Sequence, residues 1–412
     1  MGPVRILHLA DCHLDTPFYG RDEVMRRRLR DACREAFQAG VELAVERRAH
    51  AVLIAGDLFD DDRLSFATER LLLDCCRRLD EAGIPLFYAP GNHDPGRANY
   101  RARSIDWPPN VHMFASSNPE TVDIRDPDGQ AVARLTGAGH MTPAESQNMA
   151  ADFPVAEGEL PHIGLLHTQV TGARSTDRHE RYAPCTEDDL RNAGYDYWAL
   201  GHIHLRQRVC EEAPAWYAGN TQGRNPRETG SKGALWVEVE KGMPAAPEFV
   251  PLAPVVWHAE EVACPAEAEG LGPLTLQLVT TVRERMAIDD GREHFVRVDL
   301  TGQSPLAAEL AQPENLSTLT EELQEALGAG WLEVRPADVT RPVDLEEYRD
   351  GRTVLGTALE LIDKAASDDE LIEELCPEEL AGNPDDATAY LRELLDGLDR
   401  EAAARLVPEE ER

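Results

Sequence analysis

Short apolar runs alternate with helical patterns over the first 250 residues, and this alternation constrains the fold more than any other feature of the chain. Runs of about four to eight residues that are rich in β-branched and aromatic side chains are typical of buried strands. We expect strands at residues 4–10, 50–55, 84–89, 162–166, 195–200, 215–218 and 234–239, and helices at residues 21–48 and 66–82. Strands separated by helices indicate a layered α/β core.

The character of the sequence changes near residue 250. Residues 244–254 are rich in proline and alanine, which is typical of a linker. Beyond them, strand patterns at 255–262 and 294–300 and a helical pattern at 272–287 predict a second, smaller α/β unit. From about residue 350 the pattern is helical and acidic. We therefore expect three parts, at residues 1–250, 255–345 and 350–412.

The acidic C-terminal part carries apolar side chains at helical spacing. Leu355, Leu359 and Ile362 share one helix face, and Leu394 and Leu398 share another. Such faces can be buried by helices that pack within their own domain, which is the simpler interpretation. They can also dock a partner, which we keep as the alternative.

The net charge of the chain is −35 and is unevenly distributed. Residues 1–250 carry 28 Lys and Arg against 38 Asp and Glu, a balance of −10, and the remaining residues carry 13 against 38, a balance of −25. A field of this sign repels nucleic acid at long range. The charge therefore excludes a protein that binds nucleic acid through bulk positive charge, and a DNA substrate would require local basic patches, metals or a partner.

Composition argues against several other classes of protein. No apolar run approaches the ~20 residues of a membrane span, and the N-terminus lacks a signal pattern, so we expect a cytoplasmic protein with no membrane partner. The 8 cysteines form no CxxC pair. This spacing argues against a disulfide scaffold and against a zinc site ligated by cysteine.

Five polar segments each follow directly after a predicted strand. They are Asp11-Cys12-His13, Gly56-Asp57, Gly91-Asn92-His93-Asp94, His167, and Gly201-His202-Ile203-His204. In layered α/β proteins, ligands bind in the crevice outside the carboxyl ends of the strands. We therefore expect these five segments to converge on one site.

The residue types in these segments predict a metal centre. Carboxylate, imidazole and amide groups without cysteine suit divalent ions such as Mn²⁺, Mg²⁺, Fe²⁺ or Zn²⁺. Seven candidate ligands are too many for one ion but fit two ions that share a carboxylate. Two metals ~3.5–4 Å apart commonly stabilise the attacking and leaving oxygens in displacement reactions at phosphorus. Each segment alone is more typical of a structural turn, and the prediction rests on all five together.

The ordered set D-x-H, G-D, G-N-H-D, H and G-H-x-H resembles the calcineurin-like metallophosphoesterase superfamily over about residues 4–240. The resemblance implies an α/β fold in which a layered metallophosphoesterase β-sandwich is flanked by helices. It also implies that one metal is held by Asp11, His13, Asp57 and His204, and that Asp57 bridges to a second metal completed by Asn92, His167 and His202. His93 would act on the scissile phosphate or its leaving oxygen, and Asp94 would hold the His93 imidazole.

Three segments, residues 11–18, 56–60 and 217–224, resemble more narrowly the DNA-repair exonuclease branch of SbcD type, particularly its YhaO-like members. That resemblance implies manganese-dependent hydrolysis of DNA by a two-metal nuclease domain at 1–250, a capping or DNA-recognition domain at 255–345, and docking of an SMC-like ATPase at 350–412. Homodimers are common among such relatives. Some nucleases of this branch carry a second active-site histidine where this chain has Asp60.

Two groups of arginines are candidates for contacts with phosphate. Arg224 and Arg227 lie in a glycine-rich loop and could bind substrate, or the loop could be solvated and balanced by Glu228. The arginine run at residues 26–34 is diluted by acidic neighbours, and we expect a solvated helix face there.

Three functions compete at this level. The first is a two-metal phosphodiesterase that hydrolyses DNA as an exonuclease, a single-strand endonuclease or both. The second is a small-molecule phosphodiesterase or pyrophosphatase with the same site, and the third is a non-enzymatic subunit that binds a partner through its tail. The segments of the exonuclease branch favour the nuclease, the net charge of −35 favours the small substrate, and the complete ligand set argues against the third.

Overall fold

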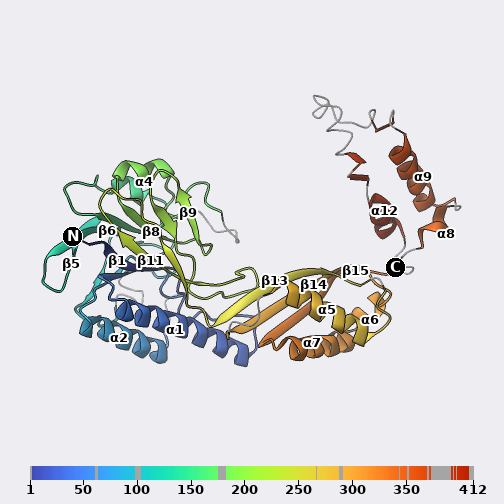
Figure 1. Ribbon diagram of the computed structural model, residues 1–412, viewed down its shortest axis with the longest axis horizontal. Helices are drawn as coiled ribbons and strands as arrows, with labels where there is room; N and C mark the ends of the chain where they lie inside the picture. Colours follow the sequence, from blue (N-terminus) through green and yellow to red (C-terminus); the bar gives the residue numbers. More distant parts are fainter. Residues whose placement is uncertain are drawn as a thin grey trace. The chain divides into compact units, whose positions relative to one another are not determined.

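The computed structural model describes residues 2–60, 64–97, 104–174, 182–265, 267–286, 291–342, 344–349, 352–368, 371–372, 391–392, 394–395 and 397–407. The chain divides into two compact units (Figure 1). The first comprises Met1–Ala259 and Ile288–Val296, and the second comprises Glu260–Ala287 and Arg297–Arg412.

The first unit contains a six-stranded sheet in the order β12-β11-β1-β2-β3-β4. Four of its strands are parallel neighbours, namely β1 (Val4–Leu9), β2 (Ala51–Ile54), β3 (Leu86–Tyr88) and β4 (Val111–Met113). The other two, β11 (Gly233–Val239) and β12 (Glu248–Pro251), continue the sheet beyond β1 in antiparallel pairing.

A second six-stranded sheet has the order β5-β6-β7-β8-β10-β9. Its central strands run parallel and are β6 (Ala131–Ala138), β7 (His162–His167), β8 (Tyr197–Gly201) and β10 (Ala215–Tyr217). The antiparallel strands β5 (Glu120–Arg125) and β9 (Gln207–Cys210) lie at its two edges.

The two sheets share one apolar core and carry helices on their outer faces. The core joins buried side chains of both sheets, among them Ile6, Leu53, Leu135, Leu165, Tyr197 and Val237. Figure 1 shows α1 (Glu23–Glu46) and α2 (Phe66–Glu81) along the first sheet, and α4 (Glu187–Ala193) on the opposite side of the sandwich. There α4 and the short helix η1 (Met149–Asp152) share a cluster with Trp198 and Leu200 of β8. The expected helix-flanked sandwich is confirmed.

Local sequence explains why α1 forms where it does. The carboxylate of Asp22 accepts a hydrogen bond from the backbone N–H of Met25 at 2.9 Å, which caps the first turn. Apolar side chains three or four residues apart then form one buried stripe, made of Leu29, Ala32, Cys33, Ala36, Phe37 and Val41. The helix expected at residues 21–48 is therefore present, two residues shorter at each end.

The expected linker at residues 244–254 is wrong in part, because it contains β12. This strand pairs with β11, and the guanidinium carbon of Arg206 lies 3.7 Å from the ring centroid of Phe249. Proline did not prevent a strand here because β12 is at the edge of its sheet, where a missing N–H costs no hydrogen bond. Strands β4, β5, β6 and β9 were also missed, since β4 and β9 have only three and four residues and β5 and β6 carry polar side chains among the apolar ones.

The second unit contains residues of the three-stranded sheet β13-β14-β15, whose strands are β13 (Val255–Ala263), β14 (Glu293–Gln303) and β15 (Trp331–Thr340). Helices α5 (Leu271–Arg285) and α7 (Pro313–Leu327) bury apolar stripes that include Leu278 and Leu323. Short helix α6 (Ala307–Leu310) precedes α7. The helix expected at 272–287 and both expected strands are present.

The described part of the acidic tail contains α8 (Leu345–Arg349), α9 (Val354–Ser367) and α12 (Leu398–Leu406). Leu355 and Leu359 of α9 form a small apolar cluster with Ala403 and Val407, while Leu361 remains exposed. Part of the predicted apolar faces is thus buried within the tail. Among the helices that the structure describes, none has the length and apolarity to cross a membrane.

Candidate two-metal site

The sandwich brings the five polar segments together at one edge. They follow β1, β2 and β3 of the first sheet and β7 and β8 of the second, as the sequence predicts. His13 Nε2 lies 3.1 Å from His204 Nε2, although 191 residues separate the two in the chain. Asn92 Oδ1 lies 2.9 Å from His167 Nε2 and 3.1 Å from His202 Nδ1.

Five of the seven predicted ligands fall into overlapping clusters of ligand atoms. Ligand atoms lie within 4.8 Å of one another in three sets: Asp11, His13 and His204; Asp11, Asp57 and His167; and His13, Asp57 and His93. Asp57 lies between His13 and His167, because its Oδ2 is 3.8 Å from His13 Nε2 and 3.5 Å from His167 Nε2. This arrangement can hold two cations that share a carboxylate.

The backbone at this edge is strained in a way that marks a functional site. Four of the candidate ligands adopt positive φ, with values of 48° at Asp11, 46° at His13, 50° at Asp57 and 104° at His202. Residues other than glycine rarely adopt this region, and each such residue costs about 1–3 kcal/mol. Strain of this kind persists only where the surrounding structure enforces it, and here the sandwich core does so.

Glycine is required where the segments approach each other. A Cβ at Gly91 would lie 2.2 Å from Asp57 Oδ1 and 2.8 Å from the backbone nitrogen of Asp57. A Cβ at Gly56, whose φ is +83°, would lie 2.2 Å from His167 Nδ1. The glycines of the G-D and G-N segments therefore allow the contact between β2, β3 and β7 that forms the site.

The donor set fits two divalent cations. Burial, and then the neighbouring Asp57 carboxylate, raise the pKa of Asp11 well above its ordinary value. Burial lowers the pKa of His13 to about 3 and that of His167 to about 4, so both imidazoles are neutral and can donate a lone pair. Two buried carboxylates within 4.8 Å of each other repel when both are ionised, and bound cations would remove that penalty.

Hydrogen bonds to the far ring nitrogens orient two of the histidines. His167 Nδ1 lies 2.9 Å from the carbonyl oxygen of Ala55, which leaves Nε2 toward Asp57. His204 Nδ1 lies 2.7 Å from Glu228 Oε1, which leaves Nε2 toward His13 and Asp11. Partners of this kind fix the ring orientation of metal-ligating histidines.

Glu228 was missed as a site residue by sequence reasoning. It was considered only as a countercharge in a solvated loop, yet its side chain is fully buried. Burial alone would raise the pKa of Glu228, but Arg224 and His204 outweigh burial and hold the pKa below its ordinary value. No spacing rule could have found this contact, since it joins two loops 24 residues apart.

His93 differs from the other site histidines because 42% of its side chain is exposed. The carboxylate against its ring belongs to Asp60, whose Oδ1 lies 2.7 Å from His93 Nδ1. Burial lowers the pKa of His93, but Asp57 and Asp60 outweigh it and raise the pKa to about 9. The two carboxylates therefore favour a protonated His93 in the metal-free chain, and its side chain is partly open to solvent.

Asp94 does not hold the His93 imidazole, contrary to the expectation from the resemblance. Its buried carboxylate instead accepts hydrogen bonds from Tyr88 Oη at 2.5 Å and from the backbone N–H groups of Gly91 and Leu58 at 2.7 and 2.6 Å. The side chains of His93 and Asp94 diverge, one toward solvent and one into the protein. Asp94 thus ties the segment after β3 to the segment after β2.

The two arginines considered for substrate binding have different environments. Arg224 is 17% exposed, and its guanidinium lies 3.5 Å from Asp60 Oδ2 and 3.7 Å from Glu228 Oε1. The side chain of Arg227 is exposed. In the arginine run on α1, ion pairs form with Glu23 and Asp31, but Arg34 is 17% exposed and also pairs with Asp15, so the expected solvated face is only partly present.

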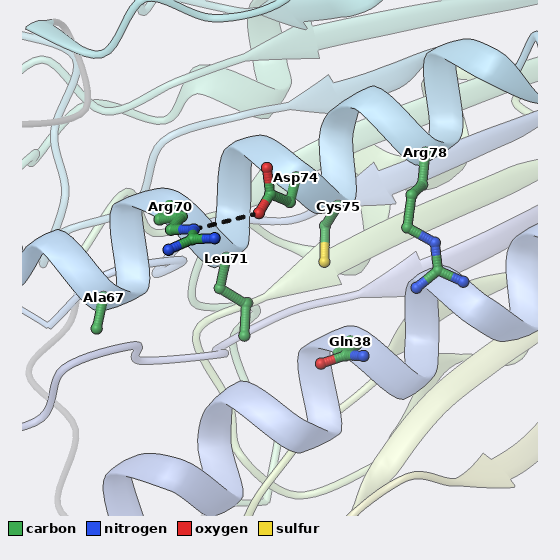
Figure 2. Close-up of a pocket in the computed structure, with 7 residues that line it drawn as sticks. All are labelled: Gln38, Ala67, Arg70, Leu71, Asp74, Cys75 and Arg78. Atoms are coloured by element: carbon green, nitrogen blue, oxygen red, sulfur yellow. Dashed lines mark ion pairs between the residues drawn. The ribbon is translucent and has the colours of Figure 1, made fainter.

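A separate cavity between α1 and α2 contains none of the predicted site residues. Its volume is about 270 Å³, and Figure 2 shows the residues that line it, Gln38, Ala67, Arg70, Leu71, Asp74, Cys75 and Arg78. An ion pair of 3.8 Å joins Arg70 to Asp74 in this lining. The cavity lacks the neutral imidazoles and paired buried carboxylates that distinguish the site at the strand ends.

Comparison with known proteins agrees with this geometry. Residues 4–206 match the family described as calcineurin-like phosphoesterase. The chain is 35% identical over 323 residues to the uncharacterized metallophosphoesterase YhaO of Bacillus subtilis strain 168, a match that covers 77% of each protein. The chain therefore belongs to the calcineurin-like metallophosphoesterase family, and it is a metal-dependent phosphoesterase of a family that uses two divalent metals.

Two further relatives are nucleases or repair proteins by name. The chain is 28% identical over 247 residues to a subunit of the nuclease SbcCD of Escherichia coli strain K12, a match that covers 53% of this chain and 60% of that protein. It is 41% identical over 90 residues to the DNA double-strand break repair protein Mre11 of Aeropyrum pernix, which covers 22% of this chain and 21% of that protein. The chain thus spans only part of the length of either relative.

The close approach at Gly91 generates a first prediction. We expect Gly91→Ala to displace the Asp57 side chain and to weaken binding of divalent cations by ~10-fold or more, since altered support of a ligand has effects of this size. Titration calorimetry of the metal-stripped protein with Mn²⁺ measures the change. Gly272→Ala is the control, because a Cβ there contacts nothing within 4 Å, and equal affinity in both variants would contradict the prediction.

Proposed function

We propose that the chain is a two-metal phosphodiesterase that hydrolyses DNA in the cytoplasm during DNA repair, as an exonuclease, a single-strand endonuclease or both. The observation that carries the proposal is the shared position of Asp57. Its Oδ2 lies 3.8 Å from His13 Nε2 and 3.5 Å from His167 Nε2, and the exposed His93 lies in the same cluster of ligand atoms. This combination suits displacement at a phosphodiester, where charge develops on both the phosphoryl and the leaving oxygens.

The ligand roles follow the expected grouping. Asp11, His13, Asp57 and His204 would hold one ion, and Asp57, Asn92, His167 and His202 the other, with Mn²⁺ as the proposed metal. When bound, two divalent cations lower the pKa of a water molecule and neutralise charge on the phosphoryl oxygens. The residues themselves keep the imidazole lone pairs available and position the carboxylate between the two ions.

His93 would serve as the general acid. Asp60 holds its Nδ1 at 2.7 Å, so Nε2 is the ring nitrogen that can donate a proton to the leaving oxygen. In the metal-free chain, Asp57 and Asp60 raise the pKa of His93 to about 9, which favours the protonated imidazole. Asp60 occupies the position where some related nucleases have a second histidine, and here it supports the first.

Several observations support DNA as the substrate. Relatives that are named as the nuclease SbcCD and as the repair protein Mre11 match parts of this chain. Arg227 is exposed and could contact a DNA phosphate. Residues 255–345 would act as a capping or DNA-recognition domain and 350–412 as the docking region for an SMC-like ATPase, and the chain could form a homodimer as relatives do.

One observation favours a second candidate. The net charge of −35 opposes the approach of long polyanions, and a small phosphodiester or pyrophosphate would be repelled less. A small-molecule phosphodiesterase or pyrophosphatase would use the same cations and the same His93.

A nuclease assay distinguishes the two candidates. The chain is stripped with chelator, restored with Mn²⁺ and incubated with end-labelled single- and double-stranded DNA. We expect cleavage that His93→Ala lowers by ~10² or more while both metals stay bound. Unchanged turnover in the variant would contradict the role of His93, and hydrolysis of bis-p-nitrophenyl phosphate without cleavage of DNA would favour the small-molecule candidate.

The bridging role of Asp57 has its own test. We expect Asp57→Asn to reduce the content of both metals, because a neutral amide replaces the shared charge. Elemental analysis of the purified protein measures the metal to protein ratio. Asp128→Asn, an exposed position between β5 and β6, is the control. Loss of one metal alone, or normal content of both, would show that Asp57 does not bridge.

The contact between Asp60 and His93 predicts a change in pH dependence. The Asp60 carboxylate stabilises the protonated imidazole and contributes to its raised pKa, so Asp60→Asn lowers that pKa. A general acid is active below its pKa, and the alkaline limb of kcat against pH should therefore move to lower pH. An alkaline limb at the wild-type position would contradict this role for Asp60.

A further inference from the structure

Resting on the proposed two-metal function, we infer that Arg224 and Glu228 are positioning residues that connect the metal ligand His204 to the proton donor His93. Neither residue would contact a metal or the substrate. They would act by fixing the positions of His204 and His93 relative to each other, from the side of the two rings that faces away from the substrate.

Glu228 forms the end of this connection at His204. Its Oε1 lies 2.7 Å from His204 Nδ1, and its Oε2 accepts hydrogen bonds from Asn220 Nδ2 at 2.8 Å and from the backbone N–H of Arg224 at 2.6 Å. The carboxylate is fully buried and has hydrogen bonds on both oxygens. A group held in this way has one orientation available, and it imposes that orientation on the His204 ring.

Arg224 lies between the two acidic partners. Its Nη1 lies 3.5 Å from Asp60 Oδ2, and its Nη2 lies 3.7 Å from Glu228 Oε1. The other oxygen of Asp60 is the one that holds His93 Nδ1 at 2.7 Å. The side chains thus form a continuous series, His204, Glu228, Arg224, Asp60 and His93.

Charge explains why Arg224 is better suited to positioning than to binding a phosphate. A buried charge requires partners, and removal of one partner leaves the others uncompensated. Without Arg224, the Asp60 and Glu228 carboxylates would face each other in a site that already contains Asp11 and Asp57. If the Arg224 guanidinium moved away to bind a substrate phosphate, the Asp60 and Glu228 carboxylates would likewise be left without their compensating positive charge.

The loop that carries Arg224 is itself held in place. The carbonyl oxygen of Gly223 accepts a hydrogen bond from Trp257 Nε1 at 2.9 Å, and Gln222 Nε2 donates to the carbonyl oxygen of Val255 at 2.9 Å. A Cβ at Gly223 would lie 2.7 Å from the carbonyl oxygen of Glu228, so the turn between Arg224 and Glu228 is tight. The guanidinium is therefore presented from a fixed backbone.

The test uses the full-length chain with Glu228→Gln, Arg224→Gln and Arg224→Lys. Titration calorimetry of metal-stripped protein measures Mn²⁺ affinity, and bis-p-nitrophenyl phosphate gives kcat and KM without requiring DNA cleavage. Arg125→Gln is the matched control, since Arg125 is exposed on β5 and pairs with Asp123 far along the chain from the site segments. Circular dichroism verifies that each variant is folded.

We expect Glu228→Gln to weaken one Mn²⁺ site by ~10–100-fold. Arg224→Gln should lower kcat by ~10-fold or more with little change in KM, the pattern of a lost contribution to the chemical step. Arg224→Lys should recover part of kcat because it restores the charge. If Arg224→Gln does not fold, the Arg224→Lys and Glu228→Gln variants test the inference by the same measurements.

Two results would overturn the inference. A raised KM with unchanged kcat and Mn²⁺ affinity in Arg224→Gln would show that Arg224 binds the substrate phosphate. Wild-type Mn²⁺ affinity in Glu228→Gln would show that Glu228 does not position His204. Failure of the wild-type chain to bind two Mn²⁺ ions would instead count against the proposed function itself.

Discussion

The structure depends on the close approach of two buried carboxylates, Asp11 and Asp57, which come from neighbouring strands of one sheet. Their mutual repulsion in a buried site is unfavourable, and burial together with Asp57 raises the pKa of Asp11. Neutral histidines surround the pair, and glycines at the adjoining positions make room for them. Bound divalent cations would offset this repulsion, which agrees with membership of a metal-dependent phosphoesterase family.

The sandwich supplies the rigidity that the site requires. Parallel strands of both sheets end at the same edge, so ligands from β1, β2, β3, β7 and β8 meet without long loops. Four candidate ligands lie in the left-handed region, and a shared apolar core holds that strain in place. Polar contacts also stabilise the site. Asp94 accepts hydrogen bonds from the segments that follow β2 and β3, and Glu228, which is not itself a candidate ligand, fixes the ring of the ligand His204.

Much of the fold, and the meeting of the five polar segments at one edge, could be predicted from local sequence, whereas the ligand roles rest on the family resemblance. The strands next to the site are short apolar runs, and the candidate ligands lie at or just after their ends, so the order of segments was sufficient to place Asp11, Asp57 and His167 at one edge. The supporting residues could not be predicted. The partner of His93 is Asp60 rather than its neighbour Asp94, and this depends on which way two adjacent side chains turn. The role of Glu228 and the presence of strand β12 likewise depend on tertiary contacts, which produce no periodic pattern in the sequence.

The most direct measurement is a crystal structure of the chain grown with Mn²⁺, with anomalous diffraction recorded at the manganese absorption edge. A two-metal site predicts two anomalous peaks ~3.5–4 Å apart, with the Asp57 carboxylate between them and Asn92, His167 and His202 around one of the two. A single peak, or two peaks of which only one contacts Asp57, would contradict the shared-carboxylate centre on which the proposed function depends.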